Sequence, residues 1–363
     1  MELNRMTVAR TARMDWSGPI AEILFGKEKR SIYIASQSQL ESLLDQARAN
    51  KVIARILPRT ESNDSETNTE LEKARAESRN RLQDALRLLN EAQKVCLDIG
   101  VPFTVIKSLD GVPDIGHDVD LLVGKNLQRV RSRLLSQFQC DTVTLTFCDR
   151  HAGKFSTFIR GFDSDFELYT RISQLGEEYY PEEDVLGRRR EESVQGSKTF
   201  LCSQEDRLLI TCIHTLYRHG KIRLSDLKVA HDALRSRIDS RLVMNTIEDA
   251  GIGKGFAVFL EILQRMGKEI LGEDLVPDEF RHYSKTIVDR DRILRLLLKQ
   301  IKPRFPLKMP VPLVTLLFLQ KAAHDLVQNR LGSSLRALLA PVLLLIDKSV
   351  PLRIQKAISV RIW

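Results

Sequence analysis

The chain has few cysteines, and their spacing matches neither a disulfide framework nor a zinc site. Five occur in 363 residues, at Cys96, Cys140, Cys148, Cys202 and Cys212, and no two of them have the CxxC spacing. Most lie within apolar patterns, which is typical of buried, reduced thiols. We therefore expect neither a disulfide nor structural zinc, and a cytoplasmic location.

Long apolar runs are also missing. The longest, "VPLVTLLFL" (311–319) and "ALLAPVLLLI" (337–346), are shorter than the roughly 18 residues needed to span a bilayer. The N-terminal stretch does not combine a basic region with an apolar core. The sequence therefore predicts neither a transmembrane segment nor a secretory signal.

Acidic residues are scarce in the last quarter of the chain. The formal net charge is +8, but residues 281–363 alone carry 16 Lys and Arg against 4 Asp and Glu. A packed helical layer with a basic exterior is the favoured interpretation, and contact with RNA or an anionic membrane surface is the alternative. Aromatic residues at the spacing used to stack single-stranded bases are absent there. We expect weak binding of polyanions at low salt and none at 200 mM. For a few contacts with phosphates, the binding affinity should fall roughly tenfold over that range.

Four segments differ in pattern. We interpret them as a small β/α N-terminal region with a polar linker, a mixed α/β domain, a helical domain and a basic helical region (1–68, 69–198, 199–280 and 281–363). In the first, "SIYIA" predicts a strand, Ser38 and Glu41 a capping box, and "KVIARIL" a second strand. Residues 59–69, "RTESNDSETNT", contain no apolar side chain, which favours a linker or mobile loop.

The second segment begins with a long amphipathic helix that ends near Gly100, and its pattern then changes to a period of two. The predicted strands lie at 101–107, 118–123, 141–148, 154–162 and 165–172, with a helix at 127–138. Short connections between the last three strands imply antiparallel pairing. From Ser203, which forms a capping box with Asp206, the pattern is almost entirely helical. The fold class is therefore α+β: a small mixed sheet with helices on one face, and a mostly helical C-terminal half.

Two aspartates precede the apolar end of the strand in "KSLDGVPDIGHDVDLLV" (107–123). Asp118 and Asp120 occupy alternate positions, so their side chains share one face of the strand. Paired carboxylates of this kind can share Mg²⁺, as phosphoryl-transfer sites require, whereas a polar strand entry beside a turn is the simpler alternative. A third carboxylate is available in "SDFELYTRI", where Asp165 and Glu167 share a face.

These motifs resemble the polymerase-beta-like nucleotidyltransferase superfamily, most closely its branch of uncharacterised nucleotidyltransferases. The similarity covers about residues 80–235 and includes "LQDALRLLNEAQKVCLDIGVPFTVIK", "GHDVDLLV" and "SQEDRLLITCIHTLYRHGKIRLSDLKVAHDAL". It implies metal-ligand roles for Asp118, Asp120 and Glu167, and places Lys107 and Ser108 beside the triphosphate. The chain departs from the pattern at Lys107, where the wider superfamily has Gly, and at Tyr169, where the branch often has His.

The resemblance implies an enzyme that transfers a nucleoside monophosphate from an NTP to an acceptor, with Mg²⁺ or Mn²⁺ as cofactor. A catalytically silent module that kept the fold and binds RNA or a protein is the alternative. The sequence does not identify the acceptor, the NTP or the oligomeric state. His214 and His219 are five residues apart, so in an α-helix they are predicted not to share a face, with His214 as a core or pocket-wall residue.

Overall fold

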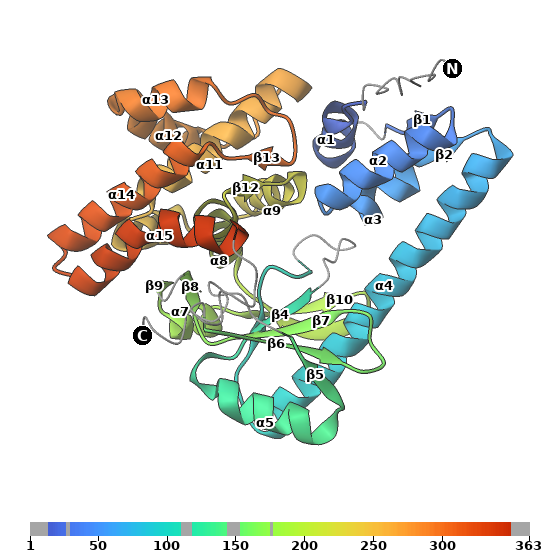
Figure 1. Cartoon of the computed structure of the whole chain (residues 1–363), viewed down its shortest axis with the longest axis horizontal. Coiled ribbons are helices and arrows are strands. Elements are labelled where there is room, and N and C mark those ends of the chain that lie inside the picture. Colours follow the sequence, from blue (N-terminus) through green and yellow to red (C-terminus); the bar gives the residue numbers. More distant parts are fainter. Residues whose placement is uncertain (1–13, 27–29, 110–117, 144–152, 175–176, 350–363) are drawn as a thin grey trace, which may run out of the picture.

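A seven-stranded mixed sheet lies at the centre of the molecule (Figure 1). The computed structural model describes residues 14–26, 30–109, 118–143, 153–174 and 177–349. The strand order is β10-β11-β3-β4-β7-β6-β5, and β4 and β7 are parallel neighbours. The strands are β3 (Thr104–Val105), β4 (Asp118–Leu122), β5 (Cys140–Thr142), β6 (Lys154–Ile159), β7 (Asp165–Tyr169), β10 (Arg190–Val194) and β11 (Ser197–Leu201).

The strands predicted around Asp118, Lys154 and Asp165 are confirmed, and β5, β6 and β7 pair antiparallel as expected. The part of the predicted 141–148 strand beyond 143 lies outside the described residues. The sequence interpretation missed the β10–β11 hairpin. Its arginines and glutamates are mostly exposed on an edge of the sheet, where backbone pairing requires no apolar side chains.

One face of the sheet packs on helices α4 (Ser65–Asp98) and α5 (Leu127–Gln137). The strand residues in this core include Val119, Leu121, Phe166 and Leu168, and none of them is more than slightly exposed. Because side chains alternate along a strand, Asp120 and Glu167 must lie on the opposite face. That face is directed toward the helical half of the chain (Figure 1).

Residues 16–62 form a small β/α unit, consisting of α1 (Ser17–Phe25), β1 (Ile32–Ile34), α2 (Gln37–Ala49), α3 (Ile53–Ile56), a 3-10 turn (Leu57–Arg59) and β2 (Thr60–Ser62). The strand and helix predicted first are confirmed, but the helix is capped by Ser36, not Ser38. The strand prediction for "KVIARIL" is wrong, because Ile56 and Leu57 are buried as part of helical turns. Packing has overridden the strand propensity of the β-branched residues.

The prediction of a linker or mobile loop at 59–69 is also wrong. Thr60–Ser62 pairs in parallel with Ile32–Ile34, and α4 begins at Ser65. The polar residues have structural roles, since the Asp64 carboxylate accepts a hydrogen bond from the Thr67 backbone N–H and caps the helix. The division of the chain at residue 68 stays a prediction.

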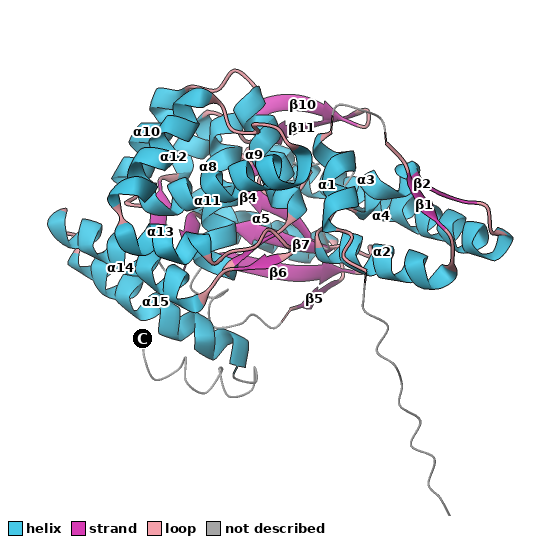
Figure 2. Cartoon of the chain, turned by 90° about the horizontal axis from the view of Figure 1, so that it is seen from above, coloured by secondary structure: helices cyan, strands magenta, loops and turns pink. Residues whose placement is uncertain are grey.

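The helical half follows the sheet and packs with the N-terminal unit in one apolar core, in which Ile34 and Leu43 join Leu208 and Leu313. Its helices are α8 (Gln204–Ile213), α9 (Leu224–Arg235), α10 (Ser240–Asp249), α11 (Gly253–Met266), α12 (Asp278–Arg290), α13 (Arg292–Lys299), α14 (Val311–Val327) and α15 (Leu331–Ser349), while the short helix α7 (Glu182–Gly187) comes earlier in the chain, before β10. Two short pairs complete the structure, β8 (Ile172–Gln174) with β9 (Glu177–Tyr180) and β12 (Lys221–Ile222) with β13 (Leu307–Lys308). Figure 2 shows α13, α14 and α15 grouped at the end of the molecule opposite β1 and β2.

The mostly helical character of the C-terminal half is confirmed, including the Ser203 cap, whose Oγ accepts a hydrogen bond from the Asp206 backbone N–H. Cys96, Cys202 and Cys212 are buried thiols, as predicted, while Cys140 is half-buried and Cys148 lies outside the described residues. Across the part of the chain that the structure describes, no helix combines the length and apolarity needed to cross a bilayer.

Candidate functional site

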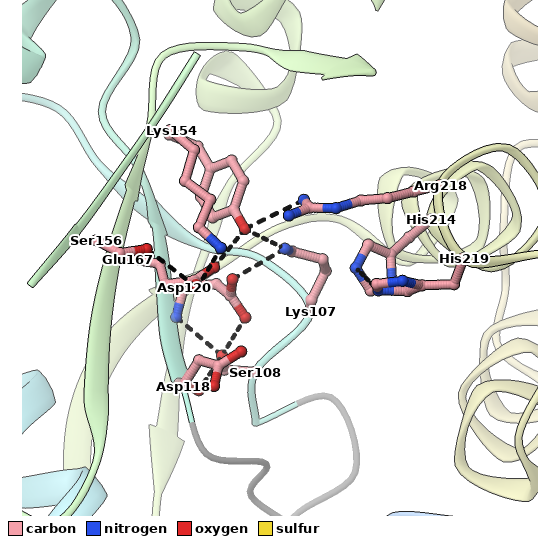
Figure 3. A network of polar contacts seen from close by, with 11 residues as sticks. Lys107, Ser108, Asp118, Asp120, Lys154, Ser156, Glu167, His214, Arg218 and His219 are labelled. Atoms are coloured by element: carbon pink, nitrogen blue, oxygen red, sulfur yellow. Dashed lines mark hydrogen bonds and ion pairs between the residues drawn. The ribbon is translucent and has the colours of Figure 1, made fainter. Parts of the chain in front are cut away.

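Three carboxylates converge on the face of the sheet opposite α4 and α5. The register pairs Asp118 with Asp165 and Asp120 with Glu167 across the parallel strands β4 and β7. One oxygen from each of Asp118, Asp120 and Glu167 lies within 4.8 Å of the other two (Figure 3). Asp165, left open by the sequence as the third carboxylate, is not part of this group. The structure therefore favours Glu167 over Asp165 as the third carboxylate.

Glu167 is held by side chains from its own strand and from β6. The Tyr169 hydroxyl donates a hydrogen bond of 2.5 Å to Oε2, and Ser156 Oγ donates one of 3.2 Å to Oε1. Lys154 forms an ion pair with Oε1. Burial raises the pKa of this carboxyl group, but the attraction of Lys107 and Lys154 outweighs it and lowers the pKa to about 2. Glu167 is therefore ionised throughout the physiological range.

Asp120 is held from the segment that follows β3. Ser108 Oγ donates to Asp120 Oδ2 at 2.8 Å and accepts from the Asp120 backbone N–H at 2.9 Å. Lys107 Nζ lies 2.9 Å from Oδ1. Burial and the neighbouring carboxylates of Glu167 and Asp118 raise the pKa of Asp120, and Lys107 lowers it. The net result is a pKa of about 6. Two neighbouring carboxylates thus have widely separated pKa values, a pattern common at catalytic sites.

Lys107 occupies a backbone conformation that favours glycine. Its φ is +62°, and a hydrogen bond of 2.6 Å from the Ser108 N–H to the Ile106 carbonyl closes a tight turn around it. A left-handed conformation costs a residue with a Cβ roughly 1–2 kcal/mol. The ammonium group offsets this cost by contacting Asp120, and it also donates a hydrogen bond of 2.7 Å to the Tyr169 hydroxyl.

The helix facing the site ends in a π-helical turn, His214–His219, closed by Gly220 at φ +54°. On the wider π-helix, residues five apart lie close to the same face of the helix. The Nε2 atoms of His214 and His219 accordingly lie 3.1 Å apart. The prediction that these histidines do not share a face is therefore wrong. The same turn directs Arg218 toward the site, where Nη1 lies 3.4 Å from the Tyr169 hydroxyl (Figure 3).

Both imidazoles are neutral in the folded protein near neutral pH. Burial, the neighbouring His219 and the cations Lys107 and Arg218 lower the pKa of His214 well below its ordinary value. Burial and Arg218 do the same for His219. The unfolded histidines take up protons near pH 6.5, so the stability that the pair contributes is complete above that pH and is lost as the pH falls below it.

We therefore expect His219→Gln to reduce the fall in the melting temperature of the protein between about pH 7.5 and pH 5. Thermal unfolding of both proteins across this range measures the difference. His282→Gln, at an exposed position on α12, is the matched control and should leave the pH profile unchanged. Parallel profiles for the wild type and His219→Gln would contradict a neutral, buried histidine pair.

A small cavity lies beside the carboxylates and has both cationic and apolar walls. Lys107, Arg171, His214 and Arg218 contribute the polar side, and the apolar lining comes from Ile106, Ile172, Ile210 and Ile213. Cations next to a carboxylate cluster can bind the phosphates of a substrate whose other oxygens bind metal. The carboxylate oxygens themselves are hard ligands that suit Mg²⁺ or Mn²⁺.

The structure brings together the five residues that the sequence singled out, Asp118, Asp120, Glu167, Lys107 and Ser108. Lys107 and Ser108 both contact the Asp120 carboxylate directly. The sequence analysis missed Lys154, Ser156 and Arg218. Lys154 and Ser156 could have been found from "KFSTF", where they alternate with the apolar Phe155 on a strand antiparallel to β7. Arg218 depends on the π-helical turn, for which the sequence gives no signal.

Comparison with known proteins identifies no relative. No family model matches the chain, and no curated protein or solved structure is significantly similar to it.

Proposed function

We propose that the protein is a metal-dependent nucleotidyltransferase of the polymerase-beta-like type. In the proposed reaction an acceptor hydroxyl oxygen forms a bond to the α-phosphorus of an NTP. The bond from that phosphorus to the β-phosphate oxygen breaks, and pyrophosphate and the hydroxyl proton leave. The observation that carries the proposal is the convergence of Asp118, Asp120 and Glu167, from two parallel strands, within 4.8 Å.

Asp118 and Asp120 would hold two Mg²⁺ or Mn²⁺ ions between them, and Glu167 would complete the site nearest the acceptor. Bound divalent ions would neutralise the negative charge on the attacking and leaving oxygens. Ser108 fixes the orientation of the Asp120 carboxylate through its 2.8 Å hydrogen bond. Lys107, released from Asp120, and Arg218 line the adjacent cavity and would contact the triphosphate.

A silent nucleotidyltransferase-like module that binds RNA or a protein is the second candidate, and one observation favours it. Lys107 and Lys154 form ion pairs with Asp120 and Glu167, so two of the three carboxylates have cationic partners without a metal. In such a module the cluster would be a structural ion-pair network. In the enzyme, metal ions would compete with these lysines for the carboxylates.

Label transfer distinguishes the two candidates. The purified chain is incubated with Mn²⁺ or Mg²⁺, a cell extract as the source of acceptors, and NTPs labelled on the α- or the γ-phosphate. The enzyme should transfer the α-label to a product and release the γ-label as pyrophosphate. Binding of Mn²⁺ should also raise the melting temperature of the protein, because the ion binds the folded state. Absence of both transfer and metal-dependent stabilisation would contradict the enzymatic proposal.

A further inference from the structure

Helix α15 has an inverted distribution of small and large side chains. Within residues 331–343, whose burial the structure describes, Ser334, Ala337 and Ala340 are the buried ones, and Ser334 Oγ donates a hydrogen bond of 2.9 Å to the Ala322 carbonyl of α14. Leu343 packs against the core, but several other large apolar residues face outward, with Leu331 68% exposed, Leu335 59% and Val342 55%. Helices of soluble proteins usually place leucine toward the core, so this surface is unusual.

The exposed residues form one stripe. Leu331, Leu335, Leu338 and Val342 are separated by four, three and four residues, which places them along one face of the helix. Leu339 extends the stripe sideways. Across the short turn at Asn329, the end of α14 adds Leu326 and the 78% exposed Val327. Scattered exposed leucines are ordinary, but a continuous apolar stripe indicates a binding surface.

This part of the chain has an excess of positive charge. Residues 326–349 contain Arg330, Arg336 and Lys348 against one acidic residue, Asp347. The nearest carboxylate on α14, Asp325, is buried against Lys321. Further along the sequence, residues 350–363 contribute three more cations, no acidic residue and a tryptophan. An apolar stripe in a stretch with a net positive charge complements a surface that is apolar inside and anionic outside.

We propose that the outer face of the α14–α15 hairpin docks on an anionic lipid bilayer. The leucines would enter the boundary between headgroups and acyl chains, and the exposed Arg330 would contact the lipid phosphates. A second copy of this chain fits less well, because a two-fold interface pairs the same patch of both copies, and residues 326–363 carry six Lys and Arg against one Asp. RNA also fits less well, because the exposed side chains are aliphatic and cannot stack on bases.

Vesicle flotation with the full chain tests the proposal. Phosphatidylcholine vesicles containing phosphatidylglycerol should carry the protein upward, and vesicles of phosphatidylcholine alone should carry much less. Replacing two outward leucines with Leu335→Glu and Leu338→Glu should lower the vesicle partition coefficient at least about tenfold, since each leucine contributes apolar burial and each glutamate adds repulsion. Arg330→Gln should lower it about fivefold and weaken its dependence on salt.

Leu97→Glu is the matched control, because Leu97 is 61% exposed on α4, far from this hairpin in the sequence. This variant should float like the wild type. Circular dichroism should show that all variants are folded, since every substituted side chain is exposed. Three outcomes would overturn the proposal: no flotation, flotation insensitive to the leucine substitutions, or a dimer that the same substitutions dissociate in the absence of vesicle binding.

Discussion

The variant Asp120→Asn is expected to lose nucleotidyl transfer by a factor of at least about one hundred while keeping its fold. Asparagine preserves the shape of the side chain and can still contact Ser108, but it lacks the charge needed to hold a divalent ion. Asp120 is buried and is one of the three carboxylates whose oxygens lie within 4.8 Å of one another. The measurement is the initial rate of α-label transfer at saturating Mn²⁺.

Asp165→Asn is the matched control for this variant. Asp165 lies on the same strand as Glu167 but outside the carboxylate cluster, so transfer by this variant should stay within a few-fold of the wild type. If Asp165→Asn were as inactive as Asp120→Asn, the third carboxylate would have been wrongly assigned to Glu167. Equal activity of Asp120→Asn and the wild type would remove the enzymatic proposal altogether.

The stability of Asp120→Asn provides a second readout. Burial and the adjacent carboxylates raise the pKa of Asp120 to about 6 in the folded protein, above the ordinary value of 3.8. The folded state therefore binds this proton more tightly than the unfolded state, and the associated stability is lost as the pH rises from about 4 through 6. At pH 8 the ionised carboxylate is unfavourable, so Asp120→Asn should melt no lower than the wild type.

The second large effect is expected at Lys321, which is 1% exposed within the helical half. Its ammonium lies 3.1 Å from Glu177 Oε1 of β9 and 3.0 Å from Asp325 Oδ2, and it donates a hydrogen bond of 3.1 Å to the Ala250 carbonyl. Arg336 of α15 also pairs with Glu177. This buried cluster connects α14 and α15 to the end of α10 and to β9.

Lys321→Met should lower the free energy of unfolding by about 3–5 kcal/mol, because two buried carboxylates lose their common cation. Urea denaturation monitored by circular dichroism measures the change. Lys299→Met, at an exposed position on α13, is the matched control and should change stability by less than about 0.5 kcal/mol.

The double variant Lys321→Met with Asp325→Leu should recover part of the loss, since one of the unpaired carboxylates is removed with the cation. A loss below about 1 kcal/mol for Lys321→Met would mean that water reaches the cluster, which would contradict its burial. A double variant less stable than the single one would mean that Asp325 has a role independent of Lys321.

The sequence by itself determined the parts of the structure that depend on local periodicity. The alternation of Asp118 and Asp120 with Val119 and Leu121 specified which face of the strand is polar, and the same rule applied to Glu167. The amphipathic pattern specified α4 up to its end before Gly100. These features were predictable because side-chain direction repeats every two or 3.6 residues whatever the distant packing.

The tertiary structure alone decided that β3 and β7 flank β4, and how the helices close on the sheet. The parallel register that places Glu167 beside Asp120, and not one step away, depends on how the apolar faces of β4 and β7 pack on α4 and α5. Packing also made "KVIARIL" helical, and the π-helical turn brought His214, Arg218 and His219 to one side. Contacts between residues far apart in the sequence set these features, and because such contacts leave no periodic signal in the chain, local patterns could not predict them.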